Sequence, residues 1–315
     1  MMNFVDMSRP RVVVTDADYP DLSIERAILE RAGITVDVPQ VKSGPRLIDA
    51  AQDADGLIVQ YARITGEVVA ALRHCRVIVR YGVGLDTIDV GAAAERGIAV
   101  HNVPDYCTEE VADHALALML AVLRGVHTLA SAVAGGQWSL EQVRPLRRIR
   151  GLTLGLIGCG RIGSSVAARA VAFGLRVLAH DPLLDATTIR ERGAEPVSLE
   201  RVLAESDVLS LHRPSLLDGA PAIGRAELEQ VKRGVVLVNT ARGSLIDEEA
   251  LREALIDGRV RAAALDVLRT EPPLAPSLAD LPNVLVTPHA AWYSEESEVQ
   301  LRTTVAQLVR DAVRR

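Results

Sequence analysis

The sequence predicts an α/β fold in two domains, each built on a parallel sheet, and three observations support this prediction. Short apolar runs alternate with helical patterns along the chain, which is typical of parallel strands covered by helices on both faces. The alternation occurs as two series, separated by a basic loop with four arginines between residues 144 and 150. The length of 315 residues is enough for two compact domains with large cores.

The first series predicts four strands, at Val12–Thr15, Leu57–Gln60, Val77–Arg80 and Ile98–His101. Helical patterns lie between them, and the one over Ile24–Ala32 follows two residues suited to capping, Asp21 and Ser23. A turn-like breaker at residues 102–104 ends the series, and a long helical stretch over about 108–134 follows it. This stretch is apolar on most faces, so we expect it to be buried.

The second series predicts six strands, at Thr153–Ile157, Arg176–His180, Val208–Leu211, Val235–Asn239, Ala262–Leu265 and Val284–Thr287. A helix is predicted over Arg161–Phe173, and Asp247 is a suitable N-cap for another. The tail from Ser294 is predicted to be helical because its apolar residues recur at helical spacing, at Leu301, Val305, Leu308 and Ala312.

Composition and charge restrict the class of protein. Apolar residues make up 49% of the chain and the net charge is −6, which indicates a globular protein and argues against a nucleic-acid partner. The cysteines, Cys75, Cys107 and Cys159, lack the spacing of metal ligands, so we predict free thiols in a reducing cytoplasm and no metal. No signal peptide is recognised, and the longest apolar run, Ala115–Leu123, is too short to cross a membrane.

The first chemical signal is GLIGCGRIG, residues 155–163. Gly158, Gly160 and Gly163 form the pattern G-x-G-x-x-G between a predicted strand and a predicted helix, and the next strand is followed by Asp181. In this dinucleotide fingerprint the glycines permit a tight turn, let the pyrophosphate approach the backbone, and let helix and strand pack closely. Asp181 would accept bonds from ribose hydroxyls and repel a 2′-phosphate, which favours NAD over NADP. The alternative is an ordinary turn beside an exposed aspartate.

Three further signals follow strands of the second series. Arg242, in VNTARGSLIDEEAL, carries a planar guanidinium that suits a carboxylate, and a structural salt bridge is the alternative. Asp266 follows the next strand and Glu271 lies in the proline-bounded loop after it, where a solvated charge is the alternative. His289, in TPHAAWYSEES, follows the last strand, and a local hydrogen-bonding role is the alternative.

Together these signals indicate one kind of chemistry. All four side chains follow strands of the domain with the dinucleotide fingerprint, at the edge where open α/β sheets bind ligands. An arginine that binds a carboxylate, a histidine, and an acid that orients it are what hydride transfer to a 2-keto acid requires. The keto oxygen gains negative charge as the hydride arrives, so a protonated imidazole can donate to it.

The order of these motifs resembles the D-isomer-specific 2-hydroxyacid dehydrogenase family over nearly the whole chain. Four segments resemble the branch of that family that contains the C-terminal-binding-protein co-repressors: VRYGVGLDTID, NVPDYCTEEVAD, RIRG and TPHAAWYSEES. The resemblance implies two doubly wound, Rossmann- or flavodoxin-like domains with a cleft between them. Residues 1–102 and 290–315 would form the substrate domain, and residues 103–289 the dinucleotide-binding domain.

The same resemblance implies a function. The protein would be an NAD-dependent oxidoreductase that interconverts a small 2-keto acid and a D-2-hydroxy acid. It would be a cytoplasmic homodimer, with no nucleic-acid partner and no membrane contact. The helix after Pro104 would form the dimer interface, through Val111, Ala115, Leu118, Met119 and Val122.

The resemblance also assigns roles to single residues. Arg242 would bind the substrate carboxylate, His289 would donate or accept the proton, and Glu271 would hydrogen-bond His289. Asp266 would contact the nicotinamide amide. The other residues implied to bind the cofactor, beside Arg242 and His289, are Thr108, Gly158, Cys159, Gly160, Arg161, Ile162, Gly163, Asp181, His212, Thr240 and Ala241. Those implied to bind the substrate, beside Arg242 and His289, are Tyr61, Arg80, Val83, Gly84 and Trp292.

Some residues depart from the co-repressor branch. Val83 stands where the co-repressors have serine, Thr108 stands where they have valine, and His212 is followed by Arg-Pro as in ordinary family members. The chain is expected to lack the disordered tail of the animal co-repressors. The absence of that tail weakens a co-repressor role. The intact set of Arg242, Glu271 and His289 favours the enzyme over the alternative, an NAD(H)-sensing interaction protein of the co-repressor type, and both uses together stay open.

The side chain of the substrate stays open. Trp292 would suit an apolar or thioether side chain, whereas Arg80 would suit a second anionic group. Trp292 could instead be an aromatic residue that packs at the hinge between the domains.

Overall fold

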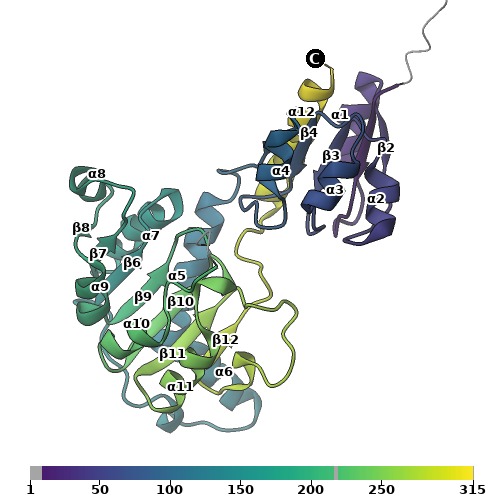
Figure 1. Ribbon diagram of the computed structural model, residues 1–315. Helices are drawn as coiled ribbons and strands as arrows, with labels where there is room; N and C mark the ends of the chain where they lie inside the picture. Colours follow the sequence, from purple (N-terminus) through teal and green to yellow (C-terminus); the bar gives the residue numbers. More distant parts are fainter. Residues whose placement is uncertain (1–8, 216–218, 315) are drawn as a thin grey trace, which may run out of the picture. The chain divides into compact units, whose positions relative to one another are not determined.

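The computed structural model describes residues 9–215 and 219–314 and divides into two compact units (Figure 1). Unit 1 contains the residues up to Tyr106 together with the C-terminal segment from Ser294, and unit 2 runs from Cys107 to Tyr293. The chain therefore changes unit twice, in each case a few residues after the boundary predicted from the sequence.

Unit 1 is built on five parallel strands in the order β2-β1-β3-β4-β5. Because β2 lies on one side of β1 and the other strands lie on the opposite side, the sheet is doubly wound, as predicted. The strands are β1 (Arg11–Val14), β2 (Thr35–Asp37), β3 (Gly56–Val59), β4 (Val77–Arg80) and β5 (Ala99–His101). The helices are α1 (Ser23–Leu29), α2 (Pro45–Ala51), α3 (Gly66–Ala71), α4 (Val90–Glu95) and the C-terminal α12 (Glu295–Val313).

Unit 2 is built on seven parallel strands in the order β12-β11-β10-β9-β6-β7-β8. The strands are β6 (Thr153–Ile157), β7 (Arg176–His180), β8 (Glu195–Pro196), β9 (Val208–Leu211), β10 (Val235–Asn239), β11 (Val260–Leu265) and β12 (Val284–Val286). The helices are α5 (Thr108–Arg124), α6 (Val126–Ala134), α7 (Arg161–Ala172), α8 (Ala186–Glu191), α9 (Leu199–Glu205), α10 (Arg225–Gln230) and α11 (Glu248–Ile256).

The strand order of unit 2 reverses at β6, which confirms the doubly wound prediction. β7 lies on one side of β6 and β9 lies on the other. The connections that leave the carboxyl ends of β6 and β9 therefore run in opposite directions along the sheet. In open α/β sheets, ligands bind in the crevice that opens at such a switch point, beyond the carboxyl ends of the strands. The segment Gly158–Gly163 follows β6 directly, so the fold places the dinucleotide fingerprint at this point.

Several local features differ from the sequence prediction. The structure adds two short strands, β2 and β8, and it divides the predicted helix over 108–134 at Gly125, whose φ of 63° is left-handed. The N-cap of α1 is Leu22, which makes no side-chain bond to the helix. Of the two residues predicted to cap it, Asp21 accepts the N–H of Ser23 with its carboxylate. Asp247 caps α11 as predicted, through the N–H groups of its second and third residues.

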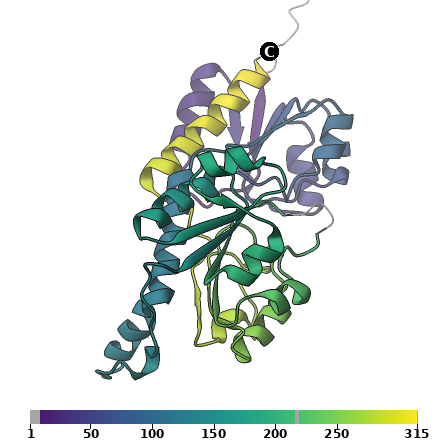
Figure 2. The ribbon, with the colours of Figure 1, turned by 90° about the vertical axis from the view of Figure 1, so that its left-hand side faces the viewer.

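The predicted burial of the helix after residue 107 is correct for α5 only. The α5 side chains that were expected to form a dimer interface are at most 6% exposed: Val111, Ala115, Leu118, Met119 and Val122. All of them except Val111 belong to a core cluster of unit 2. Helix α6 contains no buried residue and extends away from the sheet of unit 2 (Figure 2). Among the described helices none is by itself long and apolar enough to cross a membrane. α5 and α6 reach that threshold only when joined, and they are bent by 64°.

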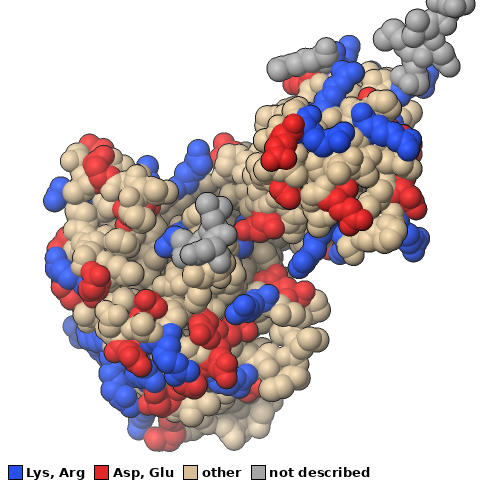
Figure 3. Space-filling model, in the orientation of Figure 1, with Lys and Arg blue, Asp and Glu red and all other residues tan. Residues whose placement is uncertain are grey.

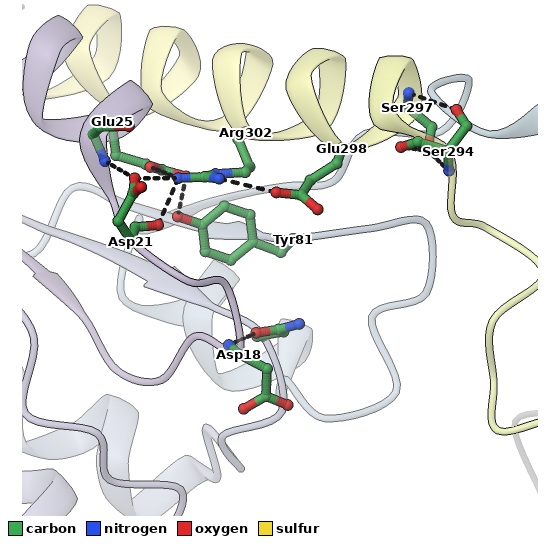
Figure 4. Close-up of polar contacts among 10 residues, drawn as sticks. Asp18, Asp21, Glu25, Tyr81, Ser294, Ser297, Glu298 and Arg302 are labelled. Atoms are coloured by element: carbon green, nitrogen blue, oxygen red, sulfur yellow. Dashed lines mark hydrogen bonds and ion pairs between the residues drawn. The ribbon is translucent and has the colours of Figure 1, made fainter.

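A buried ion-pair cluster holds the C-terminal helix in unit 1 (Figure 4). The Arg302 guanidinium of α12 donates two hydrogen bonds to the Glu25 carboxylate of α1, at 2.8 and 2.9 Å, and one to the Asp21 carbonyl. The Tyr81 hydroxyl also donates to Glu25, at 2.9 Å. Burial opposes the charge of Arg302, but the bonds and charge of Glu25 outweigh it and raise the pKa of the guanidinium. The cluster therefore ties the returning segment to the first helix of the unit.

Charged side chains are mixed on the surface. Figure 3 shows acidic and basic groups interspersed over the face drawn, in keeping with the net charge of −6. Single-sign fields are what steer nucleic acids to a protein, so this distribution gives no support to such a partner.

Candidate active site

The glycines of the fingerprint have three different environments. A Cβ atom at Gly158, whose φ is +97°, would lie 2.4 Å from the carbonyl oxygen of His212. One at Gly163 would lie 2.4 Å from the carbonyl oxygen of Gly158. One at Gly160 would meet nothing within 4 Å. The first and third glycines are therefore required by packing, whereas Gly160 leaves open space above the turn.

The structure of this turn fits a dinucleotide. Helix α7 begins directly after Gly160, beside this open space, and no N-cap side chain binds its first N–H groups. Helix N-termini bind phosphates through such groups. The hydroxyl of Thr240, after β10, is buried and has no hydrogen-bond partner among the described residues, which suits a ligand with polar groups.

Asp181 is fixed against the turn. One carboxylate oxygen accepts the N–H of Cys159 and the other accepts the N–H of Leu183, both at 2.9 Å. The Cys159 carbonyl accepts a bond from the Arg192 guanidinium at 2.5 Å. Arg192 was not predicted from the sequence, because it lies after α8, away from the motif. Burial raises the pKa of the Cys159 thiol, so this cysteine is a packing residue of the turn.

His212 follows β9, on the other side of the switch point. The residue is partly buried, and loss of contact with water lowers the pKa of the imidazole to about 4, so the ring is neutral near pH 7. One ring nitrogen is 2.8 Å from the Ser210 hydroxyl. The backbone carbonyl of His212 lies against Gly158, and the neutral ring adds no charge to the turn.

Arg242 lies in a turn that the Asn239 side chain organises. The Asn239 amide accepts the N–H of Ala241 at 3.0 Å and donates to the carbonyl of Arg242 at 2.8 Å. The next residue, Gly243, is in contact with the loop after β11: a Cβ atom there would lie 2.0 Å from the carbonyl carbon of Leu268. Glycine at this position thus lets the Arg242 turn and the loop that carries Glu271 pack against each other.

Glu271 and His289 form a hydrogen-bonded pair. The Glu271 carboxylate lies 2.8 Å from Nδ1 of His289, and its other oxygen accepts the N–H of Leu268 at 2.9 Å. Burial raises the pKa of Glu271, but the bond and charge of His289 outweigh it, and Arg242 adds to them, so the pKa is lowered. The side chains of His289 and Glu271 are 39% and 38% exposed, which leaves the pair accessible.

The backbone of His289 is in an unusual conformation. Its φ of 54° is left-handed, which costs a non-glycine residue roughly 1 kcal/mol and is typical of functional sites. The Asp266 carboxylate holds the loop around it: Oδ1 accepts the N–H of Ala290 and Oδ2 that of Ala291, both at 2.9 Å. The Thr287 hydroxyl also donates to Oδ1, at 2.5 Å.

This arrangement bears on the role expected for Asp266. The side chain is 0% exposed, and both carboxylate oxygens are bonded to the loop 287–291. Nε2 of His114, from α5, lies 3.0 Å from the Thr287 hydroxyl and 3.5 Å from the Asp266 carboxylate. Contact of Asp266 with a nicotinamide amide stays a prediction. Its observed partners, His114 and Thr287, could not be identified from the sequence pattern.

Two further predicted site residues of unit 2 lie near its two chain crossings, whereas Arg161 and Ile162 are the first residues of α7. Thr108 is the first residue of α5, directly after the first crossing. Trp292 lies just before the second crossing, is partly buried, and packs edge-on against Tyr293 with ring centroids 5.6 Å apart. This position is compatible with both the pocket and the hinge interpretations of Trp292.

The substrate residues predicted in unit 1 lie at the carboxyl edge of its own sheet. Arg80 ends β4, and its guanidinium folds over Gly82, where a Cβ atom would lie 1.8 Å from Nη1. The backbone carbonyl of Val83, next to Gly84, accepts a bond from Asn102 at 2.5 Å. The Tyr61 ring follows β3, is 43% exposed, and lies 4.9 Å from Nζ of Lys42.

Comparison with known proteins shows the class to which this chain belongs. Residues 116–291 match the family profile described as "D-isomer specific 2-hydroxyacid dehydrogenase, NAD binding domain". The chain belongs to the D-isomer-specific 2-hydroxyacid dehydrogenase family, an oxidoreductase family that binds NAD. The narrower resemblance to the co-repressor branch stays a prediction.

Individual relatives are enzymes with different substrates. The chain is 37% identical over 306 residues to a D-3-phosphoglycerate dehydrogenase of Methanocaldococcus jannaschii, covering 96% of this chain and 57% of that protein. It thus spans about half the length of the curated relatives it matches.

Solved structures show the same fold. A D-lactate dehydrogenase from Aquifex aeolicus, complexed with NAD and lactic acid, is 30% identical with a TM-score of 0.87, covering 96% of this chain and 95% of that one. A glyoxylate reductase from Paecilomyes thermophila is 31% identical with a TM-score of 0.87, covering 98% and 96%.

Proposed function

We propose that this chain uses NAD to interconvert a small 2-keto acid and the corresponding D-2-hydroxy acid, with His289 as the acid and base. The observation that carries the proposal is the accessible pair of His289 and Glu271, 2.8 Å apart. The pair lies in loops that follow strands of the sheet that also carries the dinucleotide fingerprint. A carboxylate that orients an imidazole is the arrangement that general acid–base chemistry needs.

We propose a task for each side chain. A carboxylate accepts hydrogen bonds, so Nδ1 of His289 carries the proton in the bond to Glu271, and Nε2 is the nitrogen left to exchange a proton with the substrate oxygen. Bound nicotinamide would supply or accept the hydride. Arg242 acts electrostatically on Glu271 and offers the planar fork that binds a carboxylate in two parallel bonds.

NAD is the proposed cofactor in preference to NADP. Asp181 is held at the fingerprint by its bond to the Cys159 N–H, where its charge would repel a 2′-phosphate. The relative from Aquifex aeolicus was crystallised with NAD.

The substrate is proposed only as a class. The relatives are named for 3-phosphoglycerate, lactate and glyoxylate, which share a 2-hydroxy or 2-oxo acid group and differ in the rest. We propose that Tyr61, Arg80, Val83 and Gly84 bind the substrate from the edge of the unit 1 sheet, as the family resemblance implies. The side-chain preference stays open between an apolar group and a second anion.

A second copy of the chain is the proposed macromolecular partner. The α6 helix and the loop after it expose apolar side chains, with Val126 56%, Val133 50%, Trp138 90% and Leu140 56% exposed. Clustered apolar exposure of this kind is typical of an interaction surface. Sedimentation velocity at micromolar concentration should give twice the chain mass of 33.8 kDa, whereas the mass of a single chain would contradict a dimer.

A turnover assay tests the proposed function. Keto acids with a hydrogen, a methyl, a larger apolar group or a second anionic group are each offered with NADH and with NADPH. We expect NADH-dependent reduction of at least one acid and, where the hydroxy product is chiral, oxidation by NAD of its D isomer but not of its L isomer. Tight NADH binding without turnover on any of them would favour the NADH-sensing alternative. The cytoplasmic location stays a prediction.

A further inference from the structure

The hydrogen bonds around Asp266 form a chain whose direction is fixed. The Thr287 hydroxyl donates its single proton to Oδ1 of Asp266, at 2.5 Å. The same hydroxyl must then accept the bond that joins it to His114 at 3.0 Å, so Nε2 of His114 carries a proton. The chain therefore runs from the His114 N–H through Thr287 to Asp266.

Asp266, at the end of this series of hydrogen bonds, organises the backbone on both sides of His289. The bonds to Thr287, Ala290 and Ala291 fix the residues before and after His289, and the backbone carbonyl of Asp266 accepts the His289 N–H at 2.9 Å. A left-handed non-glycine residue persists only where its surroundings over-determine it. The position of the His289 ring therefore depends on where the Asp266 carboxylate is held.

His114 is the basic side chain that lies against the Asp266 carboxylate. A fully buried carboxylate is costly unless it is paired or fully hydrogen-bonded. Among the residues that the structure describes, His114 is the only basic side chain within ion-pair distance of Asp266, at 3.5 Å. It comes from the second turn of α5 and is 26% exposed, whereas Asp266 is 0% exposed.

We propose that His114 is a positioning residue for His289, acting through Thr287 and Asp266. The proposal rests on the proposed function, because it assigns His289 the proton transfer. It also explains why α5 and the loop 287–291, which adjoin the two places where the chain changes unit, are bonded to each other. The series of hydrogen bonds thus connects His289 to α5, which follows the first change of unit, and to the loop that precedes the second.

Two matched pairs of variants test the proposal. His114→Leu and Thr287→Val each remove one bond of the chain, whereas His114→Gln and Thr287→Ser each keep a donor or a hydroxyl. We expect kcat for keto-acid reduction to fall at least tenfold in the first two and at most threefold in the second two. The dissociation constant of NADH should change less than twofold in all four. In the double variant His114→Leu with Thr287→Val, the two losses of kcat should not multiply, because both substitutions break the same series of hydrogen bonds.

A control variant and a second measurement separate positioning from general stability. Thr188→Val removes a similar hydroxyl bond, from Thr188 to Asp185 at 3.1 Å on α8, and should leave kcat unchanged. Amide hydrogen exchange should become faster at Ala290 and Ala291 in the Leu and Val variants, and stay as in the wild type in the Gln, Ser and control variants.

The outcomes that overturn the proposal differ from those that overturn the proposed function. Wild-type kcat in both His114→Leu and Thr287→Val, or equal losses in the Gln and Leu variants, would overturn the positioning role. If His114→Leu does not fold, the nearly isosteric Thr287→Val decides alone. If the wild type turns over no keto acid, the proposed function fails, and unchanged exchange at Ala290 and Ala291 in these variants would then refute the positioning role separately.

Discussion

Two glutamates with basic partners show how differently an ion pair can be used within one chain. Glu25 of unit 1 is 0% exposed and its partner Arg302 is 6% exposed, whereas Glu271 of unit 2 and His289 are 38% and 39% exposed. The first pair joins two helices, α1 and α12 (Figure 4). The second joins two loops that follow strands of the other unit.

The contrast teaches which of the two pairs is a candidate for chemistry. The Glu25 carboxylate is saturated by Arg302 and Tyr81, and a fully buried pair offers no access to a substrate. An exposed pair such as Glu271 and His289 contributes little to stability, yet its histidine keeps a strained left-handed backbone. A strained backbone that is not offset by added stability, at an accessible pair of titratable side chains, indicates a functional site.

Removing the histidine should give the largest effect on activity. His289→Ala deletes the group that exchanges the proton, so kcat should fall by roughly two to four orders of magnitude, the usual contribution of a positioned acid–base group. The dissociation constant of NADH should stay within about twofold, because the fingerprint at Gly158–Gly163 is untouched. Steady-state kinetics and fluorescence titration measure the two quantities. Retained turnover on the best keto acid would exclude His289 from the mechanism.

Breaking the buried pair should affect stability instead. Glu25→Gln leaves the Arg302 guanidinium buried beside a neutral amide, which should lower the free energy of unfolding by roughly 3–5 kcal/mol. The control is Glu253→Gln, in an ion pair with Arg225 whose side chains are 47% and 56% exposed, where the loss should be much smaller. Urea unfolding of both variants gives the comparison. Equal losses in the two would mean that burial does not distinguish the pairs.

The sequence predicts the fold better than the site for a physical reason. Strands such as Val77–Arg80 and Arg176–His180 are continuous apolar runs, so their bounds are predicted to the residue. β2 and β8 have three and two residues, and β8 contains a proline, so no period-2 or apolar run marks them. The break at Gly125 depends on a single left-handed residue within an apolar stretch.

Within the site, local motifs indicate which residues matter but not what they contact. Glu271 and His289 each follow a strand, and only the folded chain shows that they are bonded. His114 looks like an ordinary polar residue of an apolar helix, because its partners Thr287 and Asp266 lie more than 150 residues further along. Asp266 was expected to bind the cofactor, and the structure shows its carboxylate bonded to the loop 287–291.

Matched arginine-to-lysine changes sharpen the comparison between the units. Arg242→Lys replaces the planar guanidinium by an ammonium, which cannot make two parallel bonds to a carboxylate. Loss of one charged hydrogen bond costs roughly 1.5–3 kcal/mol, so kcat/KM for keto acids should fall at least about tenfold. Arg302→Lys loses the fork on Glu25 and should lower the free energy of unfolding while leaving KM for the keto acid unchanged. Kinetics and urea unfolding are measured on both variants. Wild-type kcat/KM in Arg242→Lys would make Arg242 a structural residue.

The smallest expected effect is a shift in pH dependence. Glu271→Gln removes the anion beside His289, so the protonated imidazole is less favoured and the donor form is lost at lower pH. The alkaline limb of the kcat/KM profile for reduction should therefore move to lower pH. Glu249→Gln, in the first turn of α11, is the control and should leave the limb in place.

The same variant has a signature in stability whose sign follows from the lowered pKa of Glu271. A carboxyl group whose folded pKa is lowered stabilises the protein above its unfolded pKa of about 4.3, and this contribution is lost as the pH falls through the folded value. The difference in unfolding free energy between wild type and Glu271→Gln should therefore be largest near neutral pH and shrink below about pH 4. An unmoved alkaline limb, together with a stability difference that does not depend on pH, would make Glu271 a loop charge. The pair with His289 would then differ from the pair of Glu25 and Arg302 in exposure alone.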